Sequence, residues 1–544
     1  MAQFSRFYTL LLIIISFLDF SCANIVRPDG GPKDIMPPKV QSAEPPNKSV
    51  NFKDNKIVLN FDELIDLKNP TQILVSPLSK KPPEVKIKGK SIILTFKDTL
   101  RNNTTYTVNF GESLRDYNED NILRNYEYSF STGPQLDTLS LTGKVMTATN
   151  NSDSKGILAA LYESTAHDSL FQTQAPLYIT RTNEKGSFAF NNIKAGSYKL
   201  MAIDDKNANY FFDRPDESIA FLGKNITLPD SLKKPYVLRM FSEGQEAAKV
   251  ADRRNREYGK IEVYFTKPID SLHLTALDSL PTSGNWKMET SPQHDTLLIW
   301  YRGTPDRASF SFALSGEKKY ADTLKMRNTI KEETLQELKY TSSIRLSRSN
   351  STLDIGRRAW IQFNHPIEQI DISRIQLLRD SIPITSSKQI YMDSLNPRRV
   401  LFDYAWQQDV NYRILLPDSI VKDFFGKYND EILIKFAGQN ETKYGTLLLN
   451  CPNIKPDKKY IFQLRDAKND KIVVEGPLNS SKTEWKHILP GQYTIFLVED
   501  DNDNGKWDTG NYKQQIQPEL IYNTKQQTEI KQNWDTEVEL KIDL

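Results

Sequence analysis

The stretch Ile57-Val58-Leu59-Asn60-Phe61 places apolar side chains at alternate positions, at residues 57, 59 and 61. A period of two is the pattern of a β-strand that buries one of its faces. The same alternation returns at 92–96, 106–110 and 126–130. Short strands of this kind, separated by turns rich in Pro, Gly and Asn, predict an antiparallel β-sandwich over residues 37–133.

Two later segments repeat this order of features. Ala359-Trp360-Ile361-Gln362-Phe363 matches the opening strand, and Val400 and Phe402 correspond to Ile92 and Leu94. A weaker copy begins at Ile261-Glu262-Val263-Tyr264-Phe265. We therefore expect two further sandwiches, the weaker copy over 250–335 and the stronger over 340–440.

A second kind of unit occurs twice in strict register, 295 residues apart (190 to 485, 213 to 508). Each copy contains a strand, a glycine turn, a second strand and an Asp/Asn-rich loop. Self-similarity of this length indicates a string of modules and not one large core. We expect these units over 137–242 and 442–544, and we number the five modules 1 to 5 in chain order. The matched residues are Phe190, Ile193, Gly196, Tyr198, Asp205, Asn207, Asn209 and Asp213 in the first copy, and Trp485, Ile488, Gly491, Tyr493, Asp500, Asn502, Asn504 and Asp508 in the second.

The N-terminus predicts export. Arg6 precedes an apolar run over 7–18. A charged start followed by about 7–15 apolar residues is typical of a secretory signal. A membrane-spanning helix needs about 20 apolar residues. Leu18 with Ser21-Cys22 resembles the lipobox of bacterial lipoproteins, in which the cysteine is acylated. We expect a signal peptide over 1–21, an acylated Cys22 and an extended tether over 22–36. The alternative is an ordinary signal peptide with an incidental cysteine.

Composition limits the possible partners. The 71 basic and 69 acidic residues leave a formal net charge of +2, so no basic face for nucleic acid is predicted. Beyond Cys22 there is no second apolar run long enough to span a bilayer, which leaves the acyl group as the predicted membrane contact. The chain has 2 cysteines and therefore no disulfide framework. Cys451, the other cysteine, lies in a strand-like run and is expected to be buried and inert.

Several motifs of modules 1 and 2 carry a family resemblance. Gly30-Gly31-Pro32-Lys33-Asp34, Leu59-Asn60-Phe61-Asp62-Glu63 and Thr104-Thr105-Tyr106-Thr107-Val108 resemble the Ig-like-domain lipoproteins of Bacteroidetes-type bacteria, whose first domain is SbsA-type bacterial Ig-like. Asn183-Glu184-Lys185-Gly186-Ser187-Phe188 and Ala195-Gly196-Ser197-Tyr198 resemble transthyretin-like or carboxypeptidase-regulatory-like sandwiches. The resemblance is looser beyond Phe221. It implies an all-β, multi-domain string of Ig-like (modules 1, 3 and 4) and transthyretin-like (modules 2 and 5) sandwiches at the outer membrane.

The twin Asp/Asn loops are candidates for a structural Ca²⁺ site, although no cofactor is expected to be required. Oxygen-bearing side chains at alternate positions of a tight turn converge on one point, and Ca²⁺ takes 6–8 oxygen ligands. The alternative is that Asp and Asn serve as turn residues, because their side chains bond to nearby backbone groups. The candidate ligands are Asp205, Asn207, Asn209, Asp213 and Asp216 in module 2, and Asp500, Asn502, Asn504 and Asp508 in module 5.

Aromatic residues on the same loops are candidates for ligand binding. Tyr210 and Phe211 lie on the first loop and Trp507 on the second. Aromatic rings beside polar loops stack on sugars or fill a pocket in a protein interface. The alternative is that Phe212 and Trp507, which the offset of 295 aligns, anchor each loop to its own core.

The sequence contains none of the common catalytic signatures. There is no H-E-x-x-H, G-x-S-x-G, P-loop or dinucleotide motif. The paired carboxylates Asp62-Glu63 and Asp204-Asp205 leave an unrecognised hydrolase as one alternative. The five histidines are widely scattered, at His167, His273, His294, His365 and His487.

These observations lead to a functional hypothesis. We expect a non-enzymatic, lipid-anchored envelope scaffold that recruits a protein partner at the outer membrane, with an assembly or export machine as one such partner. The segment Ala23-Asn24-Ile25-Val26-Arg27 lacks an acidic cluster of the kind that resembles a surface-export signal, which favours the periplasmic face over the cell surface. A surface carbohydrate-binding or adhesion lipoprotein is the alternative.

Overall fold

The computed structural model describes residues 33–79, 81–165, 170–229, 234–243, 248–269, 271–277, 284–304, 307–316, 320–331, 334, 341–344, 351–385, 389–524 and 527–542. Nearly all regular structure in these ranges is β-strand, which confirms the predicted all-β fold class. The exceptions are the helix α2 (Leu170–Thr173) and short 3-10 turns, η1 (Pro70–Gln72), η4 (Ile372–Arg374) and η5 (Glu441–Lys443). Within these ranges, no helix is long and apolar enough to cross a membrane.

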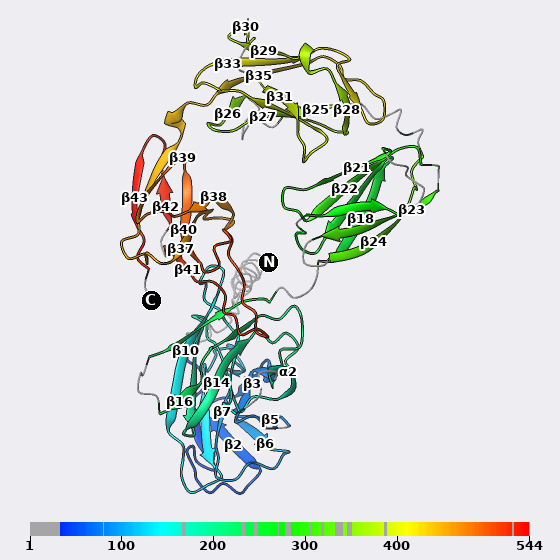
Figure 1. The fold of residues 1–544 in the computed structure, drawn as a ribbon. Helices are drawn as coiled ribbons and strands as arrows, with labels where there is room; N and C mark the ends of the chain where they lie inside the picture. Colours follow the sequence, from blue (N-terminus) through cyan, green and yellow to red (C-terminus); the bar gives the residue numbers. More distant parts are fainter. Residues whose placement is uncertain are drawn as a thin grey trace, which may run out of the picture. The chain divides into compact units, whose positions relative to one another are not determined.

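Module 1 consists of two facing sheets (Figure 1), with strand orders β1-β2-β6-β5 and β4-β7-β9, and a separate β3-β8 pair. Ile57, Leu59 and Phe61 are at most 1% exposed and share one core with Val108 and Phe130 of the facing sheet. Burying each such side chain stabilises the fold by about 1.5–3 kcal/mol. The strands are β1 (Val40–Glu44), β2 (Lys56–Phe61), β3 (Ile65–Leu67), β4 (Leu74–Ser76), β5 (Glu84–Lys88), β6 (Ser91–Thr95), β7 (Thr105–Asn109), β8 (Leu114–Asp116) and β9 (Glu127–Ser131).

Modules 3 and 4 repeat the same central strand pairing. Leu59 pairs with Ile92 in module 1, and Ile361 pairs with Val400 in module 4, as the match between the two segments predicts. Module 3 has sheets β18-β19-β22-β21 and β20-β23-β24, and module 4 has β25-β27-β32-β31, β26-β35-β33-β29-β30 and the pair β28-β34. Module 3 comprises β18 (Val250–Glu257), β19 (Lys260–Phe265), β20 (His273–Ala276), β21 (Trp286–Thr290), β22 (Thr296–Tyr301), β23 (Ser309–Gly316) and β24 (Tyr320–Arg327). Module 4 comprises β25 (Ser342–Ile344), β26 (Thr352–Leu353), β27 (Ala359–Phe363), β28 (Ile367–Ile370), β29 (Gln376–Arg379), β30 (Ile382–Pro383), β31 (Gln389–Met392), β32 (Arg399–Asp403), β33 (Asn411–Leu416), β34 (Val421–Asp423) and β35 (Ile432–Gly438).

Modules 2 and 5 share a second topology. In each, a three-stranded sheet faces a larger one: β13-β10-β17 with β12-β11-β14-β15, and β39-β36-β43 with β38-β37-β40-β41. The hydroxyl of Tyr198 donates to the Lys194 carbonyl at 2.7 Å, and Tyr493 does the same to Leu489 at 2.7 Å. Module 2 comprises β10 (Leu139–Thr147), β11 (Leu158–Glu163), β12 (Tyr178–Arg181), β13 (Ser187–Ile193), β14 (Gly196–Ile203), β15 (Ile219–Phe221), β16 (Ile226–Leu228) and β17 (Tyr236–Met240). Module 5 comprises β36 (Gly445–Asn450), β37 (Lys459–Asp466), β38 (Ile472–Pro477), β39 (Lys482–Ile488), β40 (Gly491–Asp500), β41 (Ile521–Asn523), β42 (Thr528–Ile530) and β43 (Asp535–Glu539).

Some strand pairings in the described residues depart from the antiparallel pattern. β26 pairs in parallel with β35, and β36 pairs in parallel with β43. In each case the added strand lies at the edge of its sheet. A strand in this position covers backbone groups that would otherwise be open to edge pairing, and alternation within one strand does not encode such an addition.

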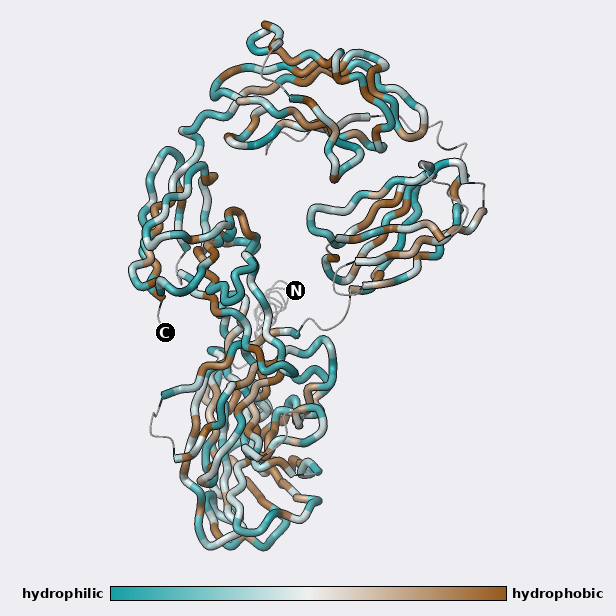
Figure 2. Tube along the Cα trace, viewed as in Figure 1, coloured by the Kyte–Doolittle hydropathy of each residue, from teal (hydrophilic) through white to brown (hydrophobic). Residues whose placement is uncertain are grey.

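Apolar residues concentrate inside the individual sandwiches (Figure 2). The chain forms two compact units, and the first contains residues up to Val145 together with Ser154–Phe211 and Lys224–Leu238. The second contains Met146–Asp153, Phe212–Gly223 and Arg239–Leu544. The second unit therefore includes modules 3, 4 and 5 whole, together with short segments of the module 2 range.

Candidate functional site

Cys22 and the signal-peptide range lie outside the described residues, so the acylation of Cys22 stays a prediction. The described chain begins at Lys33 and has no regular structure before Val40. In this segment Ile35 is 79% exposed and Met36 is 52% exposed. These two apolar side chains are thus mostly in contact with solvent.

The Asp/Asn loop of module 2 is a tight hydrogen-bonded turn. Asp205 accepts the N–H of Asn209 at 3.1 Å and that of Tyr210 at 3.0 Å, through its two carboxylate oxygens. The Asn209 side-chain oxygen accepts the N–H of Phe211 at 2.8 Å. Ala208 and Tyr210 both have positive φ, 57° and 68°. The two side chains hold the backbone in a left-handed shape that non-glycine residues adopt at a cost.

The loop of module 5 has the same geometry. Asp500 accepts the N–H of Asn504 at 3.1 Å and that of Gly505 at 2.9 Å, and Asn504 accepts the N–H of Lys506 at 2.8 Å. Asp503 and Gly505, the counterparts of Ala208 and Tyr210, have φ of 56° and 74°. The sequence repeat thus encodes one turn, built from the same side-chain acceptors in both modules.

A buried glutamate completes each loop, and neither was predicted from the sequence. Glu217 is 1% exposed and accepts the N–H of Asp213 at 3.1 Å. Glu519 is 5% exposed and accepts the N–H of Asp508 at 2.9 Å. Burial raises the pKa of Glu519, with further contributions from neighbouring carboxylates. The two glutamates do not obey the offset of 295, because the chain between loop and glutamate is longer in module 5.

The proposed calcium ligands are engaged in protein contacts. Asp508 accepts the side-chain amides of Asn502 and Asn504 at 2.5 and 2.6 Å, and Arg214 pairs with Asp216 at 2.8 Å. In the described ranges, no group of three or more His, Cys, Asp or Glu side chains is arranged to hold a metal ion. These contacts suit the turn interpretation, and calcium binding stays a prediction that chelation tests.

The loop aromatics have different surroundings. Trp507 donates its indole N–H to the Glu519 carbonyl at 3.1 Å and packs against an apolar cluster that includes Phe496. Phe212 is 7% exposed, whereas its neighbours Tyr210 and Phe211 are partly exposed. Trp507 thus ties its loop to an apolar cluster and Phe212 is buried, and a ligand-binding role for Tyr210, Phe211 and Trp507 stays a prediction.

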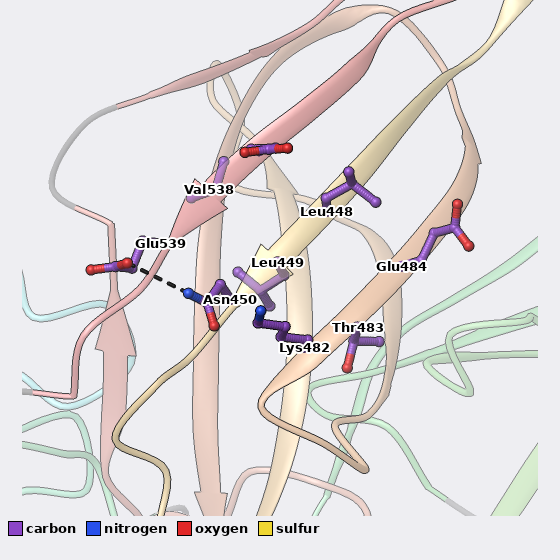
Figure 3. A pocket seen from close by; sticks show the side chains of 9 residues that line it. Leu448, Leu449, Asn450, Lys482, Thr483, Glu484, Val538 and Glu539 are labelled. Atoms are coloured by element: carbon purple, nitrogen blue, oxygen red, sulfur yellow. Dashed lines mark hydrogen bonds between the residues drawn. The ribbon is translucent and has the colours of Figure 1, made fainter.

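A hollow of about 600 Å³ lies on the three-stranded sheet of module 5 (Figure 3). Its one lysine, Lys482, is accompanied by three glutamates, and Asn450 donates to Glu539 at 3.5 Å. No aromatic side chain lines it, so it offers no ring for stacking on a sugar. The lining residues are Leu448, Leu449, Asn450, Lys482, Thr483, Glu484, Glu537, Val538 and Glu539.

A desolvated ion pair joins modules 3 and 4. The Arg398 Nε lies 2.9 Å from both carboxylate oxygens of Glu289, and the Glu289 side chain is 3% exposed. The Arg398 guanidinium also lies 5.6 Å from the ring centre of Trp300, which is 1% exposed. We call this contact the 3–4 junction. Buried charges persist in proteins only when paired in this way.

Cationic side chains of module 3 also cover one ring of module 4. The Arg302 guanidinium lies 4.4 Å from the ring centre of Phe424, and the Lys287 ammonium lies 5.7 Å from it. Arg302 pairs with Glu368 at 2.7 Å, and Lys287 donates to the Ile367 carbonyl at 2.7 Å. Burial lowers the pKa of Lys287. The junction therefore combines an aromatic ring, backbone acceptors and carboxylates on module 4 with cations on module 3.

A histidine–aspartate pair lies in the same junction. His365 Nδ1 is 2.7 Å from Asp423 Oδ2, and the two side chains are 3% and 0% exposed. The His365 ring meets Trp300 and Phe425 edge to face, with ring centres 6.1 and 5.1 Å apart. The pair is packed among aromatic rings, which is the environment of a structural contact. Sequence spacing could not indicate it, because the two residues are separated by 58 positions.

The chain that follows the second Asp/Asn loop makes long-range contacts inside the second unit. Thr509 donates to the Ser242 carbonyl at 2.8 Å, and Asn151 donates to the Ile521 carbonyl at 2.6 Å. Tyr512 of this segment also meets a ring of the 212–223 segment edge to face. This part of module 5 is thus used for intramolecular packing.

Cys451 is 0% exposed and belongs to the core of module 5. Burial raises the pKa of its thiol to about 11. The reactive form of a cysteine is the thiolate, which is scarce at neutral pH when the pKa is raised. This environment is that of the buried, inert thiol predicted from the sequence.

Comparisons with known proteins support the fold of the first module. A search of curated proteins finds no match. Among solved structures, the major pilin subunit BcpA of Bacillus cereus is 12% identical, covers 74% of this chain and 99% of its own, and gives a TM-score of 0.14. Domains 1–6 of surface layer protein SbsC are 11% identical, with 88% and 67% covered and a TM-score of 0.14. SGBP-B of the Bacteroides ovatus mixed-linkage glucan utilization locus is 11% identical, with 73% and 96% covered and a TM-score of 0.18. Likenesses at this level carry no argument about function. The family model of the bacterial Ig-like domain matches residues 34–132, and this range of the chain is therefore similar to that family.

Proposed function

We propose that the protein is a non-enzymatic envelope scaffold, anchored to the outer membrane by acyl chains on Cys22, that holds a protein partner. The observation that carries the proposal is the 3–4 junction. There the buried charged and aromatic side chains, which in an enzyme are candidates for catalysis, are used to join one sandwich to the next. This use of buried charged side chains supports a scaffold role.

The buried ion pair of the junction supports this role. A buried pair fixes relative orientation because breaking it leaves an uncompensated charge, at a cost of about 3–5 kcal/mol. Glu289 and Arg398 meet this condition, since their side chains are 3% and 17% exposed. Such a pair supports a scaffold role, because breaking it to reorient the two modules would leave a desolvated charge.

The bacterial Ig-like match over 34–132 supports an extracytoplasmic location, and the predicted lipobox supports lipid anchoring. One acyl chain gives only marginal membrane binding, whereas several chains together form a stable anchor. We further propose that the modules face the periplasm.

Membrane fractionation tests the anchor. The chain is expected in the outer-membrane fraction, and Cys22→Ser is expected to release it without loss of the folded modules. Cys451→Ser is the matched control, because that thiol is buried and should leave the distribution unchanged. If Cys22→Ser remains in the membrane fraction, the lipid anchor is wrong.

Protease treatment of intact cells tests the location. Periplasmic modules are expected to be protected until the outer membrane is permeabilised. Digestion of intact cells would place the modules at the cell surface, and would favour the adhesion alternative. In that case, glycan-array binding by the wild type that is lost in Trp507→Ala would indicate that the partner is a carbohydrate and not a protein.

A further inference from the structure

Modules 1 and 4 share a local structure at one end. In module 1, β3 pairs with β8 so that Ile65 lies opposite Asp116; in module 4, β28 pairs with β34 so that Ile367 lies opposite Asp423. Both aspartates are buried, at 1% and 0% exposure. Each accepts backbone N–H groups of the turn that follows it. The two ends thus share the Ile–Asp pairing and a turn capped by the aspartate, although a β-bulge follows Ile367 in β28 and none follows Ile65 in β3.

The residue after each aspartate occupies the same place but has a different exposure. The N–H of Tyr117 donates to the Leu64 carbonyl at 3.0 Å, and the N–H of Phe424 donates to the Pro366 carbonyl at 2.8 Å. Phe424 is 0% exposed, whereas Tyr117 is 68% exposed. The reason is that module 3 packs over Phe424. Tyr117 therefore places an aromatic ring at the equivalent position, but this ring is exposed to solvent.

The cover over Phe424 shows which chemistry this position accepts. It consists of the guanidinium of Arg302 and the ammonium of Lys287, and Arg302 is held in addition by the carboxylate of Glu368. A cation over an aromatic ring gains most when the contact is desolvated. Within this chain, such an end is thus completed by a basic protein surface.

The corresponding face of module 1 has the charge that a basic surface requires. Leu64 is 45% exposed beside Tyr117, and Glu63 and Glu119 are partly exposed near it. Burial raises the pKa of Glu63, and the neighbouring carboxylates of Asp116, Asp62, Asp34 and Glu119 raise it further. Two nearby cations, Lys68 and Arg115, are paired with Asp120 at 2.7 and 3.0 Å. The charges that act on the Glu63 carboxyl are thus mainly acidic, although Lys90 donates to the Asp62 carbonyl at 2.6 Å and Lys33 lies near Glu119.

We propose that this face, which consists of Glu63, Leu64, Tyr117 and Glu119 and which we call the leading face, docks a protein partner through an arginine or lysine side chain placed over the Tyr117 ring. The proposal rests on the proposed function, for which it supplies the partner-binding surface. An anionic membrane surface is disfavoured as the occupant, because the carboxylates of the face repel it. The described chain begins close to this face, since Asn121 donates to the Asp34 carbonyl at 3.0 Å.

Site-specific photo-cross-linking in the native membrane tests the proposal. The full chain carries a benzophenone amino acid at position 64, and the control carries it at Ile87, a residue of module 1 that is 40% exposed on β5. Cross-linked peptides are then identified by mass spectrometry. The expected product joins position 64 to a peptide of another protein that contains Arg or Lys, and it is absent at position 87.

Variants at the face distinguish a specific contact from chance proximity. Tyr117→Phe, which copies Phe424, is expected to keep the cross-link yield, whereas Tyr117→Ala should reduce it about tenfold. Glu63→Lys combined with Glu119→Lys should reduce the yield at least about tenfold, because like charges then oppose each other. Glu44→Lys, on an exposed residue of β1, is the charge control.

Other products would overturn the proposal. These products are cross-links to lipid, to residues 1–32 of the same chain, to a second copy of the chain, or to a partner peptide without a basic residue. A cross-link yield that the Tyr117 and glutamate variants leave unchanged would also overturn it. If the chain is membrane-bound but gives no cross-link, the docking role of the leading face is wrong, and the proposed lipid anchor is unaffected. Release of the chain from the membrane is measured separately with Cys22→Ser, because that variant tests the lipid anchor and not the leading face.

Discussion

Arg398→Ala removes the cation that neutralises Glu289 inside the 3–4 junction. Both carboxylate oxygens of Glu289 lie 2.9 Å from Arg398 Nε, and the Glu289 side chain is 3% exposed. Two unit charges about 4 Å apart attract each other by about 4 kcal/mol at an effective dielectric constant of about 20. Removing one partner of such a pair costs about 3–5 kcal/mol, because the other charge stays desolvated. We therefore expect the free energy of opening the junction to fall by this amount.

Hydrogen exchange of the full chain measures this change. The turn at 423–427 is held by Asp423 and lies under module 3, so its amides exchange when the junction opens. A loss of about 3–5 kcal/mol corresponds to exchange that is roughly a hundred to several thousand times faster. Exchange in the core strand β33 should change little, because Tyr412, Ile414 and Leu416 are buried inside module 4.

Arg399→Ala is the matched control. Arg399 is the next residue in sequence, but it lies 4.3 Å from the ring centre of Trp360 within module 4 and pairs with Asp393 at 3.5 Å. Its loss should leave exchange at 423–427 nearly unchanged. If Arg398→Ala accelerates this exchange no more than Arg399→Ala does, the reasoning about the buried pair is refuted. Pairing Arg398→Met with Glu289→Leu should recover most of the loss, since an apolar pair carries no desolvated charge.

Three further predictions concern modules 2 and 5 and need only the purified chain. Gly505 has φ of 74° and open space where an added methyl group would stand. Gly505→Ala should therefore destabilise the loop by about 1 kcal/mol, from backbone strain alone. Hydrogen exchange of the loop amides measures this change, and Gly223→Ala is the control. Burial raises the pKa of Glu519, so the native state binds this proton more tightly than the unfolded state does. The wild type should therefore lose stability as pH rises from about 4 through the raised pKa, whereas Glu519→Gln has no such proton and its thermal midpoint should rise relative to the wild type over that interval. An equal pH dependence of the thermal midpoint in both proteins would contradict this. A chelator should leave the thermal midpoint unchanged if the Asp/Asn loops are turns, and a midpoint that falls on chelation and returns with Ca²⁺ would support the calcium interpretation.

The sequence predicted the strands of the core well, for a local reason. Ile57, Leu59 and Phe61 alternate because each module buries one face of its own strands, and that requirement is written in consecutive residues. The offset of 295 likewise predicted one shared turn, because Asp205 and Asp500 bond to backbone groups only four and five residues away. The edge strands β26 and β43 were not predicted as parallel, since alternation does not specify the neighbour of a strand.

The candidate site was less predictable. Arg398 and Glu289 are 109 positions apart, and in sequence each has the appearance of an ordinary solvated charge. His365 likewise had no partner by spacing, although Asp423 lies 2.7 Å away. Buried glutamates such as Glu519 were missed because insertions break the register of the repeat. Charged side chains become informative only when the folded chain shows which of them are excluded from water.

The sequence by itself determined the all-β class, the repetition of two kinds of module and the twin Asp/Asn turns, because burial within a strand and hydrogen bonding within a turn are local requirements. Only the tertiary structure decided that Phe424 is covered by Arg302 while the equivalent Tyr117 is exposed. Both are aromatic residues after an aspartate, and nothing in their immediate sequence distinguishes them. The difference arises from the packing of a neighbouring module, which desolvates one ring and leaves the other in water.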